Sequence, residues 1–139
     1  MRVLGLDLGK KRIGVAISDE SGSIAMPLMA VERSGIENTI TEISRIVEEY
    51  SCKTIVVGIP YNMDGSTGRA ASAVFTFIEK LKEKIPNIEI TGWDERLSTA
   101  AVEKVLIEGN VRRDKRKGII DKLAASYILQ GWLERQQGQ

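Results

Sequence analysis

Apolar and polar positions alternate along this chain in two ways. Short apolar runs bounded by turn residues predict β-strands, and apolar residues spaced three or four positions apart predict helices. The predicted strands cover residues 2–8, 12–18, 25–32, 53–59 and 88–91. The predicted helices cover residues 34–50, 69–85, 98–108 and 118–135. This order of elements predicts an α/β fold with a mixed five-stranded sheet, three strands antiparallel and two parallel, flanked by helices.

The connections predict how the strands pair. The first three strands are joined by short turns and should form an antiparallel meander, whereas strand 53–59 follows a helix and should run parallel to the first. Strand 2–8 is apolar on both faces and is therefore predicted at the centre. Pro27 suits an edge strand, and the alternating run 88–91 also indicates an edge. On helix 69–85, the apolar stripe is predicted to include Phe75.

Length and composition set the class of protein. A chain of 139 residues predicts one domain, residues 1–139, with a sizeable core. Apolar residues make up 42%, charged residues 28%, and the net charge is +1, so nucleic-acid binding would require local basic patches rather than a generally basic surface. The chain has no run of 18 apolar residues and no signal-peptide pattern. We therefore expect a cytoplasmic protein without a membrane partner.

The chain has no histidine. This absence excludes Ser-His-Asp and Cys-His catalysis, histidine zinc sites and histidine general bases. An enzyme with this composition must use carboxylates, lysines, hydroxyls or a metal. Magnesium or manganese held by carboxylates is the leading option.

Three acidic sites stand out. Asp7 lies inside an otherwise apolar central strand, where an isolated carboxylate is disfavoured unless it has partners. Asp94 and Glu95 follow the fifth strand, at the kind of sheet edge where α/β proteins bind ligands. Asp121 lies on the last helix, one turn before alanines that allow close approach to the sheet. Three converging carboxylates would hold Mg2+ or Mn2+, and a two-ion site can hydrolyse a phosphodiester without histidine.

Each acid also has a purely structural interpretation. Asp7 could cap a turn at the end of its strand. Asp94 and Glu95 could be polar loop residues paired with Arg96. Asp121 could be a solvated residue in the first turn of its helix, where the helix dipole favours an acid.

Basic residues near these acids could guide a polyanion. Segment 112–117 carries a local charge of +4 and is predicted to lie in a loop that spans residues 109–117. Aromatic residues are few, at 5%, so contacts should go to the nucleic-acid backbone and favour shape over sequence. The candidate nucleic-acid-binding residues are Lys10, Lys11, Arg12, Arg69, Arg96, Arg112, Arg113, Lys115, Arg116 and Lys117.

Four segments carry a resemblance to a known family. They are 5–9 with 12–16, 57–60 with 64–66, 94–99, and 121–125. With them the chain resembles the YqgF/RuvX family of the ribonuclease H-like superfamily, described as Holliday junction resolvases and pre-16S rRNA nucleases. The resemblance spans nearly the whole chain. It implies a small bacterial endonuclease in which Asp7, Glu95 and Asp121 match the metal-binding acids.

The resulting hypothesis is a metal-dependent endonuclease that processes the 5′ end of precursor 16S rRNA. A Holliday junction resolvase is the first alternative, and symmetric cutting of two strands would favour a twofold dimer. An ATP-phosphate-binding domain and an RNA-binding module that does not cleave are further alternatives. We expect a monomer or a weak homodimer whose partner is precursor rRNA or branched DNA.

Overall fold

The computed structural model describes residues 1–96 and 113–138, and the side chains of residues 1–96 and 123–138. The predicted helix 98–108 and Arg112 lie outside the described residues. The strands are β1 (Arg2–Leu8), β2 (Arg12–Ser18), β3 (Ala25–Glu32), β4 (Cys52–Ile59) and β5 (Glu89–Asp94). The helices are α1 (Ile36–Tyr50), α2 (Arg69–Lys84) and α4 (Arg113–Gln137).

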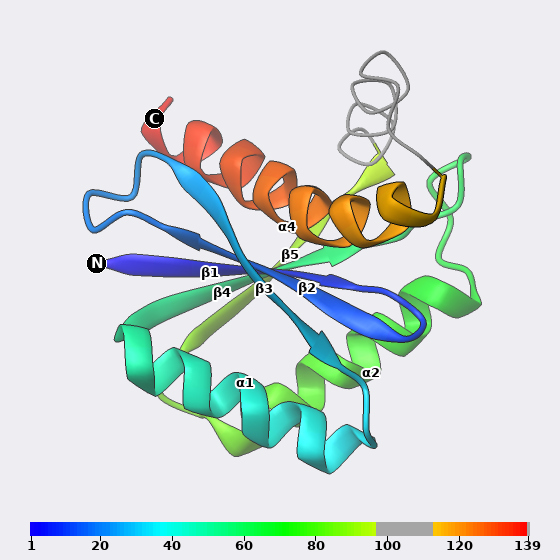
Figure 1. Ribbon diagram of the computed structural model, residues 1–139, viewed down its shortest axis with the longest axis horizontal. Coiled ribbons are helices and arrows are strands. Elements are labelled where there is room, and N and C mark those ends of the chain that lie inside the picture. Colours follow the sequence, from blue (N-terminus) through cyan, green and yellow to red (C-terminus); the bar gives the residue numbers. More distant parts are fainter. Residues whose placement is uncertain (97–112, 139) are drawn as a thin grey trace.

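The strands form one mixed sheet in the order β3-β2-β1-β4-β5. β2 pairs antiparallel with β1 and β3, and β4 pairs parallel with β1 and β5. β1 therefore lies at the centre and β3 and β5 lie at the edges, as the sequence predicts. The sheet and its flanking helices are visible in Figure 1.

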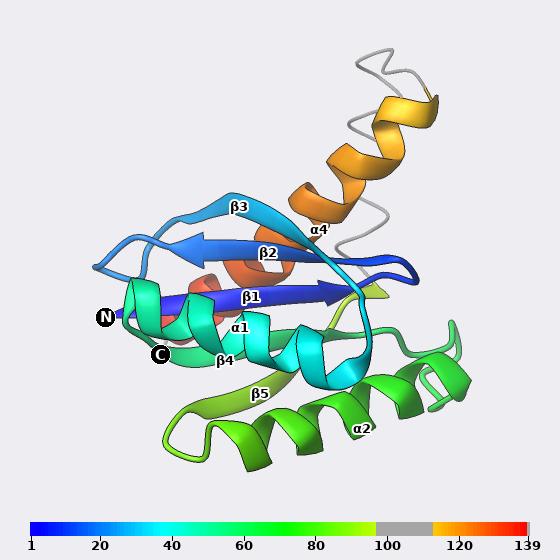
Figure 2. The ribbon, with the colours of Figure 1, turned by 60° about the horizontal axis from the view of Figure 1, so that its bottom comes forward.

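Helices cover the two faces of the sheet unequally. α1 and α2 lie on one face and α4 crosses the other (Figures 1 and 2). Side chains of β1 alternate between these layers, because successive residues of a strand point to opposite faces. Leu4 and Leu6 belong to the core beneath α1 and α2, whereas Val3 packs in the core beneath α4. Within the described residues, no helix is long and apolar enough to cross a membrane.

Gly5 allows α4 to approach β1 closely. A methyl group added to Gly5 would lie 2.8 Å from the Cβ atom of Leu129 and 3.1 Å from the carbonyl oxygen of Ala125. Both alanines at this turn of the helix, Ala124 and Ala125, are buried. The small residues predicted to bring this part of α4 onto the sheet are therefore packed against it.

Three sequence predictions of element bounds or burial are wrong. β5 continues through Asp94, so Asp94 is in the strand and not after it. α4 begins at Arg113, so residues 113–117 are helical and not part of a loop; lysine and arginine favour helices, and Gly118 does not end this one. On α2, Phe77 is buried while Phe75 is 40% exposed. Phe77 follows Val74 by three residues and precedes Leu81 by four, which places it on the buried stripe.

Candidate active site

Two of the predicted acids meet at the carboxyl end of the parallel strands. Asp7 is in β1, and Glu95 comes directly after β5, where its backbone N–H donates to the carbonyl oxygen of Ile59 at the end of β4 (3.2 Å). Because β1, β4 and β5 are parallel, their carboxyl ends share one edge of the sheet. The side chains of Asp7 and Glu95 are linked there by a hydrogen bond.

The pair perturbs the ionisation of Glu95. The pKa of Glu95 is raised from 4.5 to about 8, chiefly by burial and then by the charge of Asp7, the hydrogen bond with Asp7 and the charge of Asp94. Without a cation, this shift favours the protonated form of the Glu95 carboxyl group. The turn-capping interpretation of Asp7 does not account for this pairing with a second carboxyl group, which follows the edge strand β5.

Gly58 of β4 provides the space for the Glu95 side chain. A methyl group at this position would lie 2.5 Å from Oε2 of Glu95 and 2.5 Å from Cδ1 of Ile128 in α4. No real side chain tolerates such contacts, so one of the two neighbours would have to move. Sequence reasoning did not assign Gly58 to the site. The signal that could have identified it is a glycine inside a buried strand, because such a glycine often marks a place where another group approaches the strand backbone closely.

Arg96 is paired with Asp94 and not with Glu95. Its Nε atom donates to both Asp94 carboxylate oxygens, each at 3.0 Å, and its Nη2 atom donates to Oδ2 at 2.6 Å. The hydrogen bonds from Arg96 hold the pKa of Asp94 below its usual value. Arg96 also donates from Nη1 to the carbonyl oxygen of Met63 (3.3 Å) and lies 6.0 Å from the ring centre of Tyr61. Arg96 thus connects the end of β5 to the loop between β4 and α2, and its contact with a phosphate stays a prediction.

That loop, residues 61–68, is internally hydrogen-bonded. The backbone N–H of Asn62 donates to the carbonyl oxygen of Ser66 (3.0 Å), and the Ser66 backbone N–H and hydroxyl donate to Oδ1 of Asp64 (2.9 and 2.6 Å). Gly65 has a φ of +87°, in the left-handed region that favours glycine. These hydrogen bonds order the loop, and the contact between Arg96 and Met63 joins it to the end of β5.

The third acid, Asp121, is a residue of α4. Its backbone is described by the structure, but its side chain is not. Since α4 begins at Arg113, Asp121 is not in the first turn, and the interpretation based on the helix dipole there is wrong. Asp121 precedes Ala125, which packs beside Gly5 of β1, by four residues. Its convergence with Asp7 and Glu95 stays a prediction.

The other predicted basic residues within the described part of the chain fall at three places: the β1–β2 turn, the start of α2 and the start of α4. Lys10 and Lys11 form the turn between β1 and β2, and Arg12 begins β2 and forms an ion pair with Glu32 (3.8 Å). Arg69 is the first residue of α2. The remaining four, Arg113, Lys115, Arg116 and Lys117, are in the first turns of α4, and their side chains lie outside the described part of the chain.

The acid pair fits a hard divalent cation. Its donors are carboxylate oxygens, which Mg2+ prefers, and two protein ligands suffice because Mg2+ retains several waters. The described side chains contain no cluster of three or more acidic, cysteine or histidine groups suited to a metal. A third protein ligand would therefore come from outside them.

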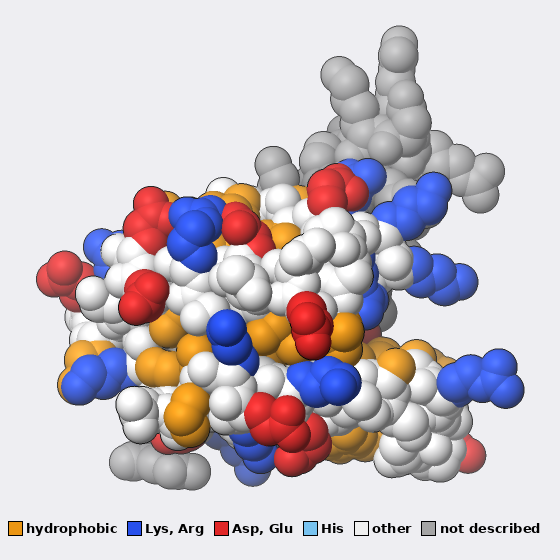
Figure 3. Space-filling view, turned by 90° about the horizontal axis from the view of Figure 1, so that it is seen from below, with side chains coloured by type: hydrophobic (Ala, Val, Ile, Leu, Met, Phe, Trp, Pro, Cys, Tyr) orange, Lys and Arg blue, Asp and Glu red, His pale blue; other side chains and the backbone are white. Residues whose placement is uncertain are grey.

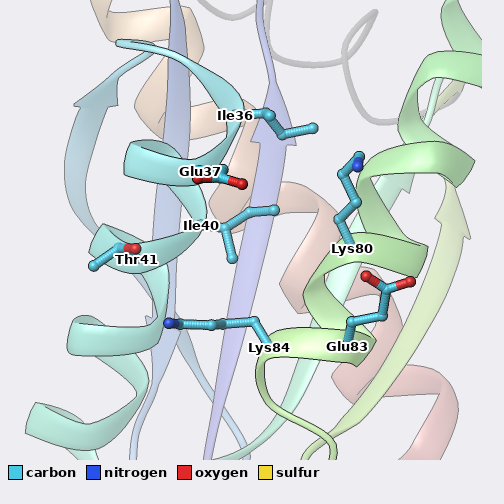
Figure 4. A pocket seen from close by; sticks show the side chains of 7 residues that line it. All are labelled: Ile36, Glu37, Ile40, Thr41, Lys80, Glu83 and Lys84. Atoms are coloured by element: carbon cyan, nitrogen blue, oxygen red, sulfur yellow. The ribbon is translucent and has the colours of Figure 1, made fainter.

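A separate groove lies between α1 and α2 (Figure 4). Its lining residues are Ile36, Glu37, Ile40, Thr41, Lys80, Glu83 and Lys84. None of them is a predicted site residue, and α1 and α2 cover the face of the sheet opposite α4. This groove does not belong to the candidate active site.

Comparison with solved structures identifies the fold. The fold is ribonuclease H-like: it resembles that of Thermus thermophilus RuvC in complex with a Holliday junction substrate (TM-score 0.56, 15% identity, 99% of this chain and 96% of that chain). It also resembles the fowlpox virus Holliday junction resolvase (TM-score 0.56, 16% identity, 98% of this chain and 99% of that chain).

At the level of sequence, residues 1–135 match the family RuvX, described as Holliday junction resolvase, and the chain belongs to this family. A relative from Desulforamulus reducens is 51% identical over 96% of this chain and 97% of its own length. A relative from Clostridium beijerinckii is 46% identical over 96% of both chains. Both are named "Putative pre-16S rRNA nuclease". The family resemblance noted from the sequence is thereby confirmed.

Proposed function

We propose that this chain is a metal-dependent endonuclease that hydrolyses phosphodiester bonds at the 5′ end of precursor 16S rRNA. The observation that carries the proposal is the hydrogen-bonded pair Asp7 and Glu95 at the carboxyl edge of the sheet. Two carboxyl groups held this close cannot both ionise at neutral pH without a compensating positive charge. A divalent cation supplies that charge.

The chain's own residues define the chemistry of the site. Asp7 and Glu95 present oxygen ligands, Asp121 is the proposed third, and the lack of a side chain at Gly58 leaves room for the Glu95 carboxyl group. A bound Mg2+ or Mn2+ would activate a water molecule and stabilise the leaving oxygen of the phosphodiester. Glu95 must release its proton before it can act as a ligand, so the pH dependence of metal binding reports on this residue.

The substrate assignment is supported by the relatives, which are named as pre-16S rRNA nucleases and align over nearly the full chain. Basic residues of the β1–β2 turn and the start of α2 favour a polyanion at the same edge. A Holliday junction resolvase is the second candidate, because the family description names that activity. Low aromatic content, at 5%, supports recognition of nucleic-acid shape by backbone contacts in either case.

One cleavage experiment tests the proposal and separates its alternatives. An end-labelled RNA with the 5′ leader of 16S rRNA and a four-way DNA junction are incubated with Mg2+ and either the wild type or Asp7→Asn. We expect the wild type to cut the RNA at a defined position and Asp7→Asn or excess EDTA to abolish cutting. Cutting of the junction alone would support the resolvase. If the wild type binds both substrates and cuts neither, the enzyme hypothesis is wrong.

A further inference from the structure

A hollow of about 410 Å³ lies at the same edge of the sheet, on the face covered by α1 and α2. Its floor is apolar and includes Leu8, Pro60 and Val74. Lys10, Arg33 and Arg69 stand around it. It combines an apolar floor with a cationic rim, which neither the metal chemistry nor the core packing requires.

The hollow and the acid pair are built on consecutive residues. Asp7 of β1 joins the acid pair, and the next residue, Leu8, lines the hollow and packs against the core beneath α1 and α2. At the end of β4, Ile59 accepts the hydrogen bond from the Glu95 backbone, and the next residue, Pro60, lines the hollow. A nucleic-acid strand that crosses this edge of the sheet would therefore meet the acid pair on one face and the hollow on the other.

The charges around the hollow suit phosphate. The described side chains that line it include no acid, and none of its three cations forms an ion pair with another described residue. Arg33 is held in place, because its Nη1 atom donates to the carbonyl oxygen of Gly9 at 2.8 Å.

The start of α2 adds to this positive field. Arg69 is the first residue of α2, and the N-cap, Gly68, provides no side-chain cap for the free N–H groups there. Figure 3 shows lysine and arginine side chains gathered around an indentation at the right-hand end of this face.

We propose that the hollow binds one unpaired nucleotide of the substrate strand, next to the phosphodiester that is cut. The base or sugar would pack on the apolar floor and its phosphate would contact the rim. A volume of about 410 Å³ lies in the range of small-ligand pockets and does not admit a duplex. The floor contains no aromatic ring, so binding should tolerate any base. This inference rests on the proposed nuclease function and adds that the substrate is single-stranded on one side of the cut.

The test measures binding without cleavage. Fluorescence anisotropy in EDTA follows a short labelled single-stranded RNA and, separately, a blunt RNA duplex. Ala73→Leu fills the hollow from α2, and Ser72→Leu places the same side chain at an exposed neighbouring position that does not line it. Arg69→Gln removes a rim charge, and Lys80→Gln removes one elsewhere on α2.

We expect Ala73→Leu and Arg69→Gln each to weaken single-strand binding about tenfold, with the duplex affected less and the two control variants unchanged. Urea unfolding checks that each variant is folded, and Arg69→Gln keeps the test valid if Ala73→Leu does not fold. Wild-type affinity in both variants, or equal losses for single strand and duplex, would overturn the inference. If the wild type cuts RNA and both variants bind normally, the nuclease proposal stands without this site. If the variants lose binding but the wild type cuts nothing, the hollow stands and the nuclease proposal fails.

Discussion

Replacing Glu95 by Gln should make the metal-free protein more stable than the wild type at pH 8, although it removes a residue of the active site. In the folded protein the pKa of Glu95 is raised to about 8, whereas the unfolded chain ionises near the ordinary value of 4.5. Between these two values the folded state binds more protons than the unfolded state, so wild-type stability falls as the pH rises. Gln cannot ionise, so the variant lacks this part of the pH dependence.

The size of the effect follows from the shift. One pKa unit corresponds to about 1.4 kcal/mol, so the full change from 4.5 to about 8 would correspond to about 5 kcal/mol. Solvent reaches part of the Glu95 side chain and screens its interactions, so we expect on the order of 2–3 kcal/mol. Because the chain has no histidine, few other groups titrate between pH 5 and 8.

Urea unfolding in EDTA at pH 5 and pH 8 measures this difference. The wild type should lose stability relative to Glu95→Gln between the two values, and saturating Mg2+ should restore it in the wild type alone. Glu89→Gln, at an exposed position of β5, the strand that precedes Glu95, should follow the wild type. Parallel pH profiles for the wild type and Glu95→Gln would refute the argument that burial and Asp7 raise the pKa of Glu95.

Two further substitutions test the packing around the site. Gly58→Ala places a methyl group 2.5 Å from Oε2 of Glu95 and should both weaken Mn2+ binding and lower the free energy of unfolding by about 1–3 kcal/mol. The comparison variant Gly92→Ala places a methyl group 2.9 Å from the Ile59 side chain and contacts neither acid side chain, so it should lower stability but keep Mn2+ affinity. Normal Mn2+ binding by Gly58→Ala would contradict the first expectation. Ser18→Ala removes the buried acceptor of the Val3 backbone N–H (2.8 Å) and should lower the free energy of unfolding by about 1–3 kcal/mol; no measurable change in urea unfolding would contradict this.

The sheet was predictable because its strands are strongly patterned. The apolar run around Asp7 identified the central strand, and Pro27 identified an edge. Ends of elements were harder to locate. The charged residues that begin α4 are compatible with a loop or a helix; lysine and arginine favour a helix only weakly, and the long helix that follows decides their state. Phe77 is spaced to join Val74 and Leu81, but Phe75 is also four residues after Ala71 and three before Ile78, so the pattern admitted both and the packing buries Phe77.

The pairing of Asp7 with Glu95 was also predictable, because an acid in an apolar strand and an acid after a parallel strand meet at one edge. The partner of Arg96 could not be predicted, because Asp94 and Glu95 are both close to it in the sequence. The path of the backbone after β5 decides that Arg96 binds Asp94. The role of Gly58 depends on the position of a side chain from another strand, which no local pattern encodes. The hollow beside Arg33 likewise joins residues from four separate segments.

Manganese binding tests the central claim most directly. Isothermal titration at pH 8 compares the wild type with Asp7→Asn, Glu95→Gln and the surface control Glu89→Gln. The account predicts that the wild type and Glu89→Gln bind Mn2+ alike and that either substitution in the acid pair abolishes binding. Unchanged Mn2+ affinity in Asp7→Asn or Glu95→Gln would show that the two carboxyl groups do not hold a cation together.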